Sequence, residues 1–169
     1  GSGASSAHLD LTGTDPTFEA YTSNLTIGGK MNADGFGTAN GSLVLGDNSS
    51  LHVGTAGSLG IVNVGMNQSS VWPFGHGSAT SGGSGTGLLD ATQGQVDLHL
   101  SELNVGRHTG YYGTATGTLR WDQAEPIDVD KAYFGRGPST GVLEVPAGGT
   151  FKLGTADNPL SLLAISYND

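Results

Sequence analysis

Two groups of side chains in this chain are of types that bind ligands. The first is a set of aromatic residues and one histidine in stretches rich in Gly, Ser and Thr: Trp72, Phe74, His76, Tyr111 and Tyr112. Exposed aromatic rings often form platforms for sugar rings or contacts for another protein. The alternative is that these rings fold back and cover the side of the fold, so the sequence leaves both roles open.

The second group is a pair of arginines. Arg107 and Arg136 each follow the glycine that closes an apolar–x–apolar–Gly tetrad. If the two tetrads stack, the guanidinium groups lie one above the other with Lys131 nearby, and they can then hold a sulfate, a carboxylate or a uronic acid. The alternative is that they are corner residues that neutralise an acidic surface. Arg107 and Arg136 therefore join the aromatic group as candidate ligand-binding residues.

Catalytic chemistry has weaker support. Four carboxylates lie close together in the sequence, Asp122, Glu125, Asp128 and Asp130, and paired carboxylates can act as acid and base on a glycosidic bond or bind calcium. Outward carboxylates also keep a surface soluble, and we favour this interpretation. The histidines are scattered and expected to be exposed, and no Gly-x-Ser-x-Gly elbow occurs. The sequence thus predicts no catalytic residue, no metal site and no cofactor, and it favours a non-enzymatic protein.

Composition bounds the class of protein. Of 169 residues 30 are Gly, 12% are charged, none is Cys, and the formal net charge is −9. The low charge indicates a folded chain rather than a disordered one. The acidic balance argues against a nucleic-acid partner, whose backbone attracts clustered Lys and Arg. No apolar run of about 20 residues occurs, so insertion of this segment into a membrane is not expected.

Short strand signals recur along the chain. A Gly–x–Leu block begins at four glycines, which are Gly41, Gly87, Gly117 and Gly141, and it alternates with the apolar–x–apolar–Gly tetrads. The longest match relates residues 41–56 to 141–156. Apolar residues at i and i+2 of each strand share one face. This recurrence is typical of a chain that stacks coils on itself, and it predicts that Leu43, Leu119 and Leu143 occupy one column.

These signals predict an all-β fold, most simply a single parallel β-helix, or β-solenoid, of about five or six coils over residues 7–169. A β-sandwich with Greek-key strands is the second choice. Residues 1–6 are read as an expression remnant or linker, and residues 66–86 as a long loop that leaves the coils. The glycines that close the tetrads are expected at strand ends, where the chain turns a corner. Only Asp15–Tyr21 favours a short helix.

Sequons for N-linked glycosylation occur at Asn24, Asn40, Asn48 and Asn67. In a secreted eukaryotic protein they would accept glycans. A chain rich in Asn, Ser and Thr also produces such matches by chance, so the sequence leaves the modification undecided.

The alternation of Gly-Thr-Leu-x-Trp/Val with Leu-Asn-Val-Gly resembles the repeats of autotransporter passenger domains and related bacterial surface proteins. The resemblance covers the chain after about residue 20 and implies a parallel β-helix with protruding loops. It also implies a structural or adhesive segment of a larger exported protein, extracellular or at the cell surface. The partners would be a glycan or a surface protein of a host or neighbouring cell, and further coils of the same parent chain. Polysaccharide lyases share this scaffold, so a carbohydrate-active protein, either lyase-like or glycan-binding, remains the alternative.

Overall fold

The computed structural model describes residues 3–13, 17–31, 37–68, 82–109, 113–156 and 158–168. These residues form strands and no helix, which confirms the expected all-β class. The strands are β1 (Ala4–Asp10), β2 (Phe18–Thr22), β3 (Asn24–Lys30), β4 (Thr38–Val44), β5 (Ser49–Val53), β6 (Gly60–Asn67), β7 (Ser84–Ala91), β8 (Gln95–His108), β9 (Thr114–Trp121), β10 (Asp128–Arg136), β11 (Ser139–Glu144) and β12 (Leu162–Tyr167). No helix long and apolar enough to cross a membrane occurs in this part of the chain.

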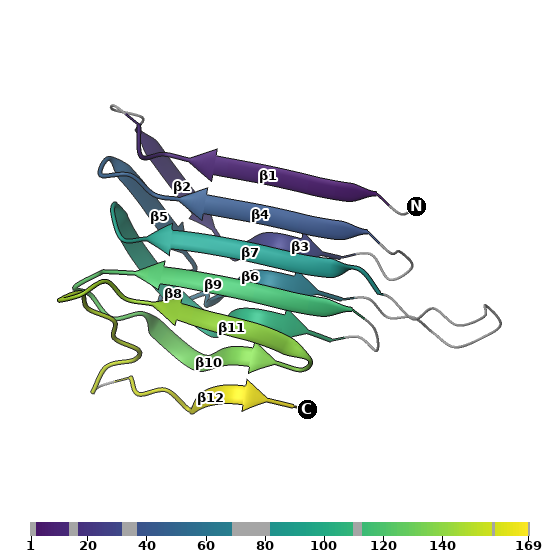
Figure 1. Cartoon of the computed structure of the whole chain (residues 1–169). Helices are drawn as coiled ribbons and strands as arrows, with labels where there is room; N and C mark the ends of the chain where they lie inside the picture. The colour runs from purple at the N-terminus through teal and green to yellow at the C-terminus, as the bar shows by residue number, and fades with distance from the viewer. Residues whose placement is uncertain are drawn as a thin grey trace, which may run out of the picture.

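The strands form two sheets in which every strand pair is parallel. The first sheet has the order β1-β4-β7-β9-β11, and the second has the order β12-β10-β8-β5-β2, with β6 pairing both β3 and β8. Figure 1 shows the strands of the first sheet stacked one beyond the other in chain order. A Greek-key sandwich needs antiparallel neighbours, so the described strands exclude that alternative.

A continuous file of leucines runs through the first sheet, where a file means register partners on successive strands. Its members are Leu9, Leu43, Leu89, Leu119 and Leu143. Leu89 and Leu119 are fully buried, whereas the end members Leu9 and Leu143 are 44% and 36% exposed. Burial of one leucine contributes about 2 kcal/mol, so the file is one source of cohesion between the strands. The prediction that Leu43, Leu119 and Leu143 share one column is confirmed.

Glycines let the two sheets approach backbone to backbone. Four of them form a file on the first sheet: Gly41, Gly87, Gly117 and Gly141. Facing them on the second sheet are glycines with positive φ: Gly28, Gly65, Gly106 and Gly135. A Cβ placed on Gly87 would lie 2.3 Å from the backbone nitrogen of Gly65. These four tetrad glycines therefore lie within strands rather than at corners, because they are needed where two backbones meet without side chains between them. The tetrad glycine Gly54 does follow the end of a strand, β5, as expected.

Three expected boundaries differ from the structure. β1 begins at Ala4 and pairs with β4, so residues 4–6 lie in a sheet although the sequence assigns 1–6 to a linker. β6 continues to Asn67 and β7 begins at Ser84, which narrows the expected 66–86 loop. Phe18–Thr22 is a strand rather than part of a helix, because Phe18 and Ala20 alternate toward the core.

Candidate functional site

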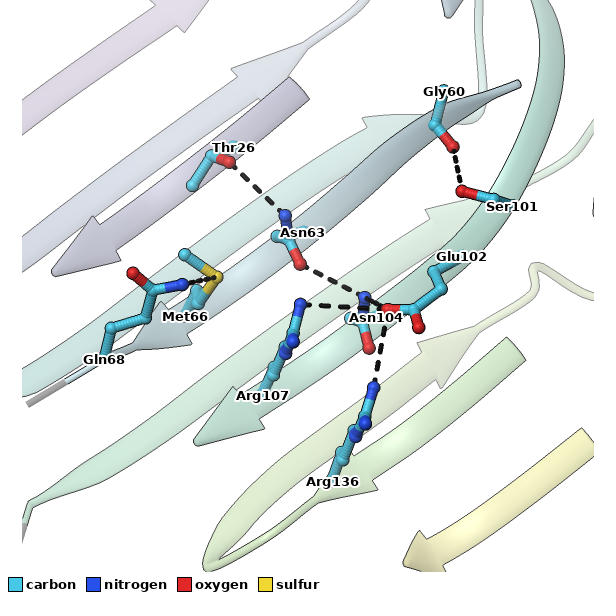
Figure 2. A network of polar contacts seen from close by, with 10 residues as sticks. All are labelled: Thr26, Gly60, Asn63, Met66, Gln68, Ser101, Glu102, Asn104, Arg107 and Arg136. Atoms are coloured by element: carbon cyan, nitrogen blue, oxygen red, sulfur yellow. Dashed lines mark hydrogen bonds and ion pairs between the residues drawn. The ribbon is translucent and has the colours of Figure 1, made fainter. Parts of the chain in front are cut away.

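The two arginines singled out by the sequence are register partners on adjacent strands β8 and β10. Both approach one carboxylate. Arg136 Nη1 lies 3.4 Å and Arg107 Nη1 3.8 Å from Glu102 Oε2, as Figure 2 shows. The arginine side chains are 16% and 22% exposed. The pair is therefore a partly buried ionic cluster built around a carboxylate, rather than two isolated corner charges.

Gly106 explains why Arg107 reaches Glu102. Glu102 and Asn104 are two residues apart and face the same side of β8, so strict alternation would put Arg107 on the opposite side. Gly106 has a φ of 73°, a left-handed conformation that interrupts the alternation by one residue. The Arg107 side chain then lies on the side of Glu102 and Asn104.

An amide ladder leads into the same cluster. Thr26, Asn63 and Asn104 are register partners on β3, β6 and β8. Asn63 Nδ2 donates to Thr26 Oγ1 at 3.5 Å, and Asn104 Nδ2 donates to Asn63 Oδ1 at 3.2 Å. Asn104 Nδ2 also lies 3.2 Å from Glu102 Oε2 and donates to it. We refer to Asn63, Glu102, Asn104, Arg107 and Arg136 as the Glu102 cluster.

Two atoms of the Glu102 cluster are buried without a hydrogen-bond partner. They are the acceptor Asn104 Oδ1 and the donor Arg107 Nε. An unpaired buried polar group costs about 1–3 kcal/mol. Arg107 Nε and Asn104 Oδ1 are therefore a buried donor and a buried acceptor whose hydrogen bonds are not made.

An aromatic pair borders the Glu102 cluster. The Arg136 guanidinium carbon lies 4.5 Å from the centre of the Tyr133 ring, within the range of a cation–π contact. Tyr133 is buried, and its ring lies 5.6 Å from that of Tyr167. Tyr167 is the register partner of Arg136 on β12 and is 39% exposed. An accessible aromatic ring thus continues the row that Arg107 and Arg136 begin.

A second polar row lies along β2, β5, β8 and β10. His99 Nδ1 lies 2.8 Å from Asp128 Oδ2, and His99 Nε2 lies 3.3 Å from Asp97 Oδ1. Asp97 Oδ2 lies 3.5 Å from His52 Nδ1, and the His52 ring stacks on Tyr21 at 4.5 Å. His52 and His99 are therefore carboxylate partners rather than isolated exposed side chains. The spacing Asp97-x-His99, which puts both groups on one strand face, was the available sequence signal.

In the described part of the chain this row does not form a metal site. It borders a groove of about 420 Å³ lined by Asp97, His99, Glu125, Asp128, Asn158 and neighbouring side chains. No group of His, Cys, Asp and Glu side chains in the described part of the chain is placed to hold a metal ion. Of the other carboxylates that the sequence groups with Asp128, Asp122 accepts a hydrogen bond from Thr150 N at 2.9 Å.

The aromatic candidates Trp72, Phe74, His76, Tyr111 and Tyr112 lie outside the described residues, in 69–81 and 110–112. The described residues that flank these stretches do meet. Asn67 is fully buried, and its Nδ2 donates to the carbonyl oxygens of Gly82, Gly83 and Thr114 at 3.2, 3.3 and 3.2 Å. One amide thus ties together residues that flank both stretches. Because it is buried, the Asn67 sequon is closed to glycosylation in the folded chain.

Asn67 belongs to a buried polar file at this corner of the fold. Lys30, Asn67 and His108 are register partners on β3, β6 and β8, and all three are buried. Burial lowers the pKa of Lys30, because the ammonium form loses its hydration. Three buried polar side chains therefore lie at the ends of β3, β6 and β8. Residues 69–81 and 110–112 follow β6 and β8 in the sequence.

The chain matches no protein-family model, no curated protein and no solved structure. Its function is therefore inferred from its own side chains. Of the sequence candidates, Arg107 and Arg136 come together, whereas Glu102, Asn104, Tyr133 and Tyr167 are additional members of the site. The one sequence signal for Asn63 and Asn104 is that each occupies the second position of a tetrad, before Val-Gly.

Proposed function

We propose that the chain is a parallel β-helix of five coils that serves as a non-enzymatic structural and adhesive segment of a larger exported cell-surface protein. One strand of the five-stranded first sheet and the strands that follow it would form each coil. For example, β4, β5 and β6 would make one coil, and β1, β2 and β3 the coil before it. The resemblance to autotransporter passenger repeats supports the same assignment.

The leucine file is the observation that carries the structural part of this proposal. Its members come from every strand of the first sheet, and each contacts the next in register. In a stack of this kind each coil contacts only its neighbours, and the backbone bonds and side-chain files run along the whole stack. Such a body resists bending and suits a stalk that holds a binding surface away from a cell.

The adhesive part of the proposal rests on where the aromatic stretches are attached. Residues 69–81 and 110–112 depart from neighbouring strand ends, since Asn67 pairs with His108. They return at neighbouring strand starts, since Ser84 pairs with Thr114. A glycan or a surface protein of another cell is the proposed partner of the aromatic residues that these stretches carry.

The last strands support a further partner, additional coils of the parent chain. Leu163 and Ile165 continue apolar files of the second sheet, yet they are 54% and 76% exposed. Apolar side chains in these files are covered by the next strand elsewhere in the stack. A further coil packed on β11 and β12 would cover them in the same way.

A glycan array with the intact chain and a Trp72→Ala variant tests this function. The expected result is binding without turnover of any bound polysaccharide, and loss of binding in the variant. Circular dichroism of both proteins checks that the substitution leaves the strands intact. Release of unsaturated or hydrolysed sugar products would contradict a non-enzymatic role.

The alternative is a carbohydrate-active protein, as a glycan-binding module or a lyase-like enzyme. The Glu102 cluster with its neighbour Tyr167 favours the binding module, because paired guanidinium groups beside an exposed aromatic ring suit sugar recognition. This candidate is compatible with the structural role. Glu102, Arg107 and Arg136 are partly exposed, whereas other residues of the same strands, such as Leu103 and Ala132, belong to the core.

A further inference from the structure

We propose that the face formed by Arg107, Arg136 and Tyr167 binds a carboxylate-bearing polysaccharide, a polyuronate chain that lies across β8, β10 and β12. This inference rests on the glycan-binding alternative above and names its ligand class. The three residues are register partners on adjacent strands, so they form one row.

Charge favours an anionic ligand at this row. The chain has a net charge of −9 and only six Lys and Arg residues, yet two of these cations stand side by side here. Within the Glu102 cluster the two guanidinium groups share one carboxylate, that of Glu102. A guanidinium can bind a carboxylate through two parallel hydrogen bonds. Ligand carboxylates at Arg107 and Arg136 would replace or share the role of Glu102.

The spacing of the row suits a linear polymer of sugars. Adjacent strands lie about 4.8 Å apart, which is close to the length of one sugar residue in an extended chain. Successive residues of a polyuronate would therefore meet Tyr167, Arg136 and Arg107 in turn. Tyr167 offers its ring as a stacking surface, and the contact with Tyr133 holds the Arg136 guanidinium in place before the ligand arrives.

The unpaired atoms of the Glu102 cluster indicate what the ligand would complete. Arg107 Nε lacks an acceptor and Asn104 Oδ1 lacks a donor. A uronate supplies both, because its carboxylate accepts hydrogen bonds and its hydroxyl groups donate them. Since both atoms are buried, the Arg107 side chain must shift when the ligand binds. The new hydrogen bonds would offset the cost of that shift.

Isothermal titration calorimetry with oligogalacturonate, its full methyl ester and a neutral dextran oligomer tests the proposal. We expect saturable binding of oligogalacturonate that weakens with added NaCl, and no binding of the ester or of dextran. The double variant Arg107→Gln/Arg136→Gln should bind at least about tenfold more weakly, because the charge-assisted hydrogen bonds are lost. The matched control is Arg120→Gln on the first sheet, where Arg120 pairs with Glu144 and Asp90, and its affinity should be unchanged.

Further variants keep the test independent of folding. Arg107→Lys retains the charge without the two-pronged geometry and should bind with intermediate affinity. Tyr167→Ala removes only the ring and should weaken binding, with an unchanged circular dichroism spectrum. Equal binding of oligogalacturonate and its ester would overturn the proposal, as would full binding by the double arginine variant. Binding of dextran sulfate alone would also overturn it, since the ligand would then be a sulfate.

The outcome also separates this inference from the adhesive function. Oligogalacturonate binding that Trp72→Ala abolishes and the arginine double variant leaves intact would overturn the polyuronate site and keep the adhesive role. Polyuronate binding that persists in Trp72→Ala would support the site by itself. Cleavage of oligogalacturonate would instead overturn the non-enzymatic assignment.

Discussion

Gly117 on β9 faces Gly106 on β8 so closely that a Cβ on Gly117 would lie 2.4 Å from the Gly106 nitrogen. The same Cβ would lie 2.0 Å from the carbonyl oxygen of Val64. Both obstacles are backbone atoms, which cannot rotate away as a side chain can. The distance between the two sheets at this level is therefore set by the absence of side chains.

Gly117→Ala is expected to destabilise the fold by about 3 kcal/mol, because the added methyl group overpacks a backbone contact. Urea unfolding followed by circular dichroism measures the change. Gly57→Ala is the control, since nothing lies within 4 Å of a Cβ at Gly57. If the two variants unfold at the same urea concentration, the sheets do not meet in the way described.

Ser166→Gly is expected to stabilise the chain by about 0.5–1 kcal/mol. Ser166 has a φ of 58° and occupies the position on β12 that Gly135 occupies on β10. A left-handed backbone costs a non-glycine residue about 1–2 kcal/mol, and glycine avoids this cost. Part of the resulting stabilisation is lost, because glycine has more conformational freedom in the unfolded chain. Ser50→Gly in β5, where φ is not positive, should destabilise in the same thermal-melt assay. A lower melting temperature for Ser166→Gly would contradict the assigned backbone conformation.

Glu102→Gln is expected to cost about 1–2 kcal/mol, because two partly buried guanidinium groups lose their shared carboxylate. A double-mutant cycle with Arg136→Gln in urea unfolding isolates the coupling between the two residues. Glu144→Gln provides the comparison, since the Arg120–Glu144 pair is about half exposed and such pairs are worth less than about 1 kcal/mol. A coupling energy of zero between Glu102 and Arg136 would rule out the Glu102 cluster as drawn in Figure 2.

The Asp10 carboxylate should titrate below its usual pKa of 3.8, because the Thr12 hydroxyl and then the Thr12 backbone N–H donate to it at 2.6 and 3.0 Å. A lowered pKa in the folded state means that this carboxylate favours folding above pH 3.8. That contribution is lost as the pH falls through the lowered value. Carbon-detected NMR titration measures the pKa directly.

Thr12→Val is the companion variant for this titration. It removes the hydroxyl donor and keeps the backbone donor, so the pKa of Asp10 should rise toward 3.8 without fully reaching it. An Asp10 titration that is the same in both proteins would show that the hydroxyl bond is not formed in solution.

The stacking of leucines could be predicted from the sequence because it depends on a local spacing. Gly–x–Leu repeats in β4, β7, β9 and β11, and the two-residue period alone puts Leu43, Leu119 and Leu143 on the inner side of their strands. The packing of glycine on glycine could not be predicted in this way. It depends on which positions of two different sheets face each other, and the sequence contains no measure of that distance.

Only part of the Glu102 cluster can be predicted from the sequence, for a related reason. Asn63 and Asn104 are 41 residues apart, whereas the Glu102–Arg136 contact spans 34, so no constant repeat length aligns them. The sequence predicts Arg107 and Arg136 as candidates because each follows a tetrad glycine. Glu102 and Tyr167 have register partners of other residue types on the adjacent strands, so no repeated residue marks their positions in the sequence. Only the register of the strands brings them beside the arginines.

Asn67 gives the fold a practical use in protein engineering. Its side-chain amide donates hydrogen bonds to Gly82 and Gly83, so it connects the residues before and after 69–81. It also donates to Thr114, which follows residues 110–112 in the sequence. A foreign peptide grafted between residues 68 and 82 would start and finish on anchored backbone. The strands would thus form a scaffold for displaying inserted peptides, and different peptides could be inserted without changing the strand pairing.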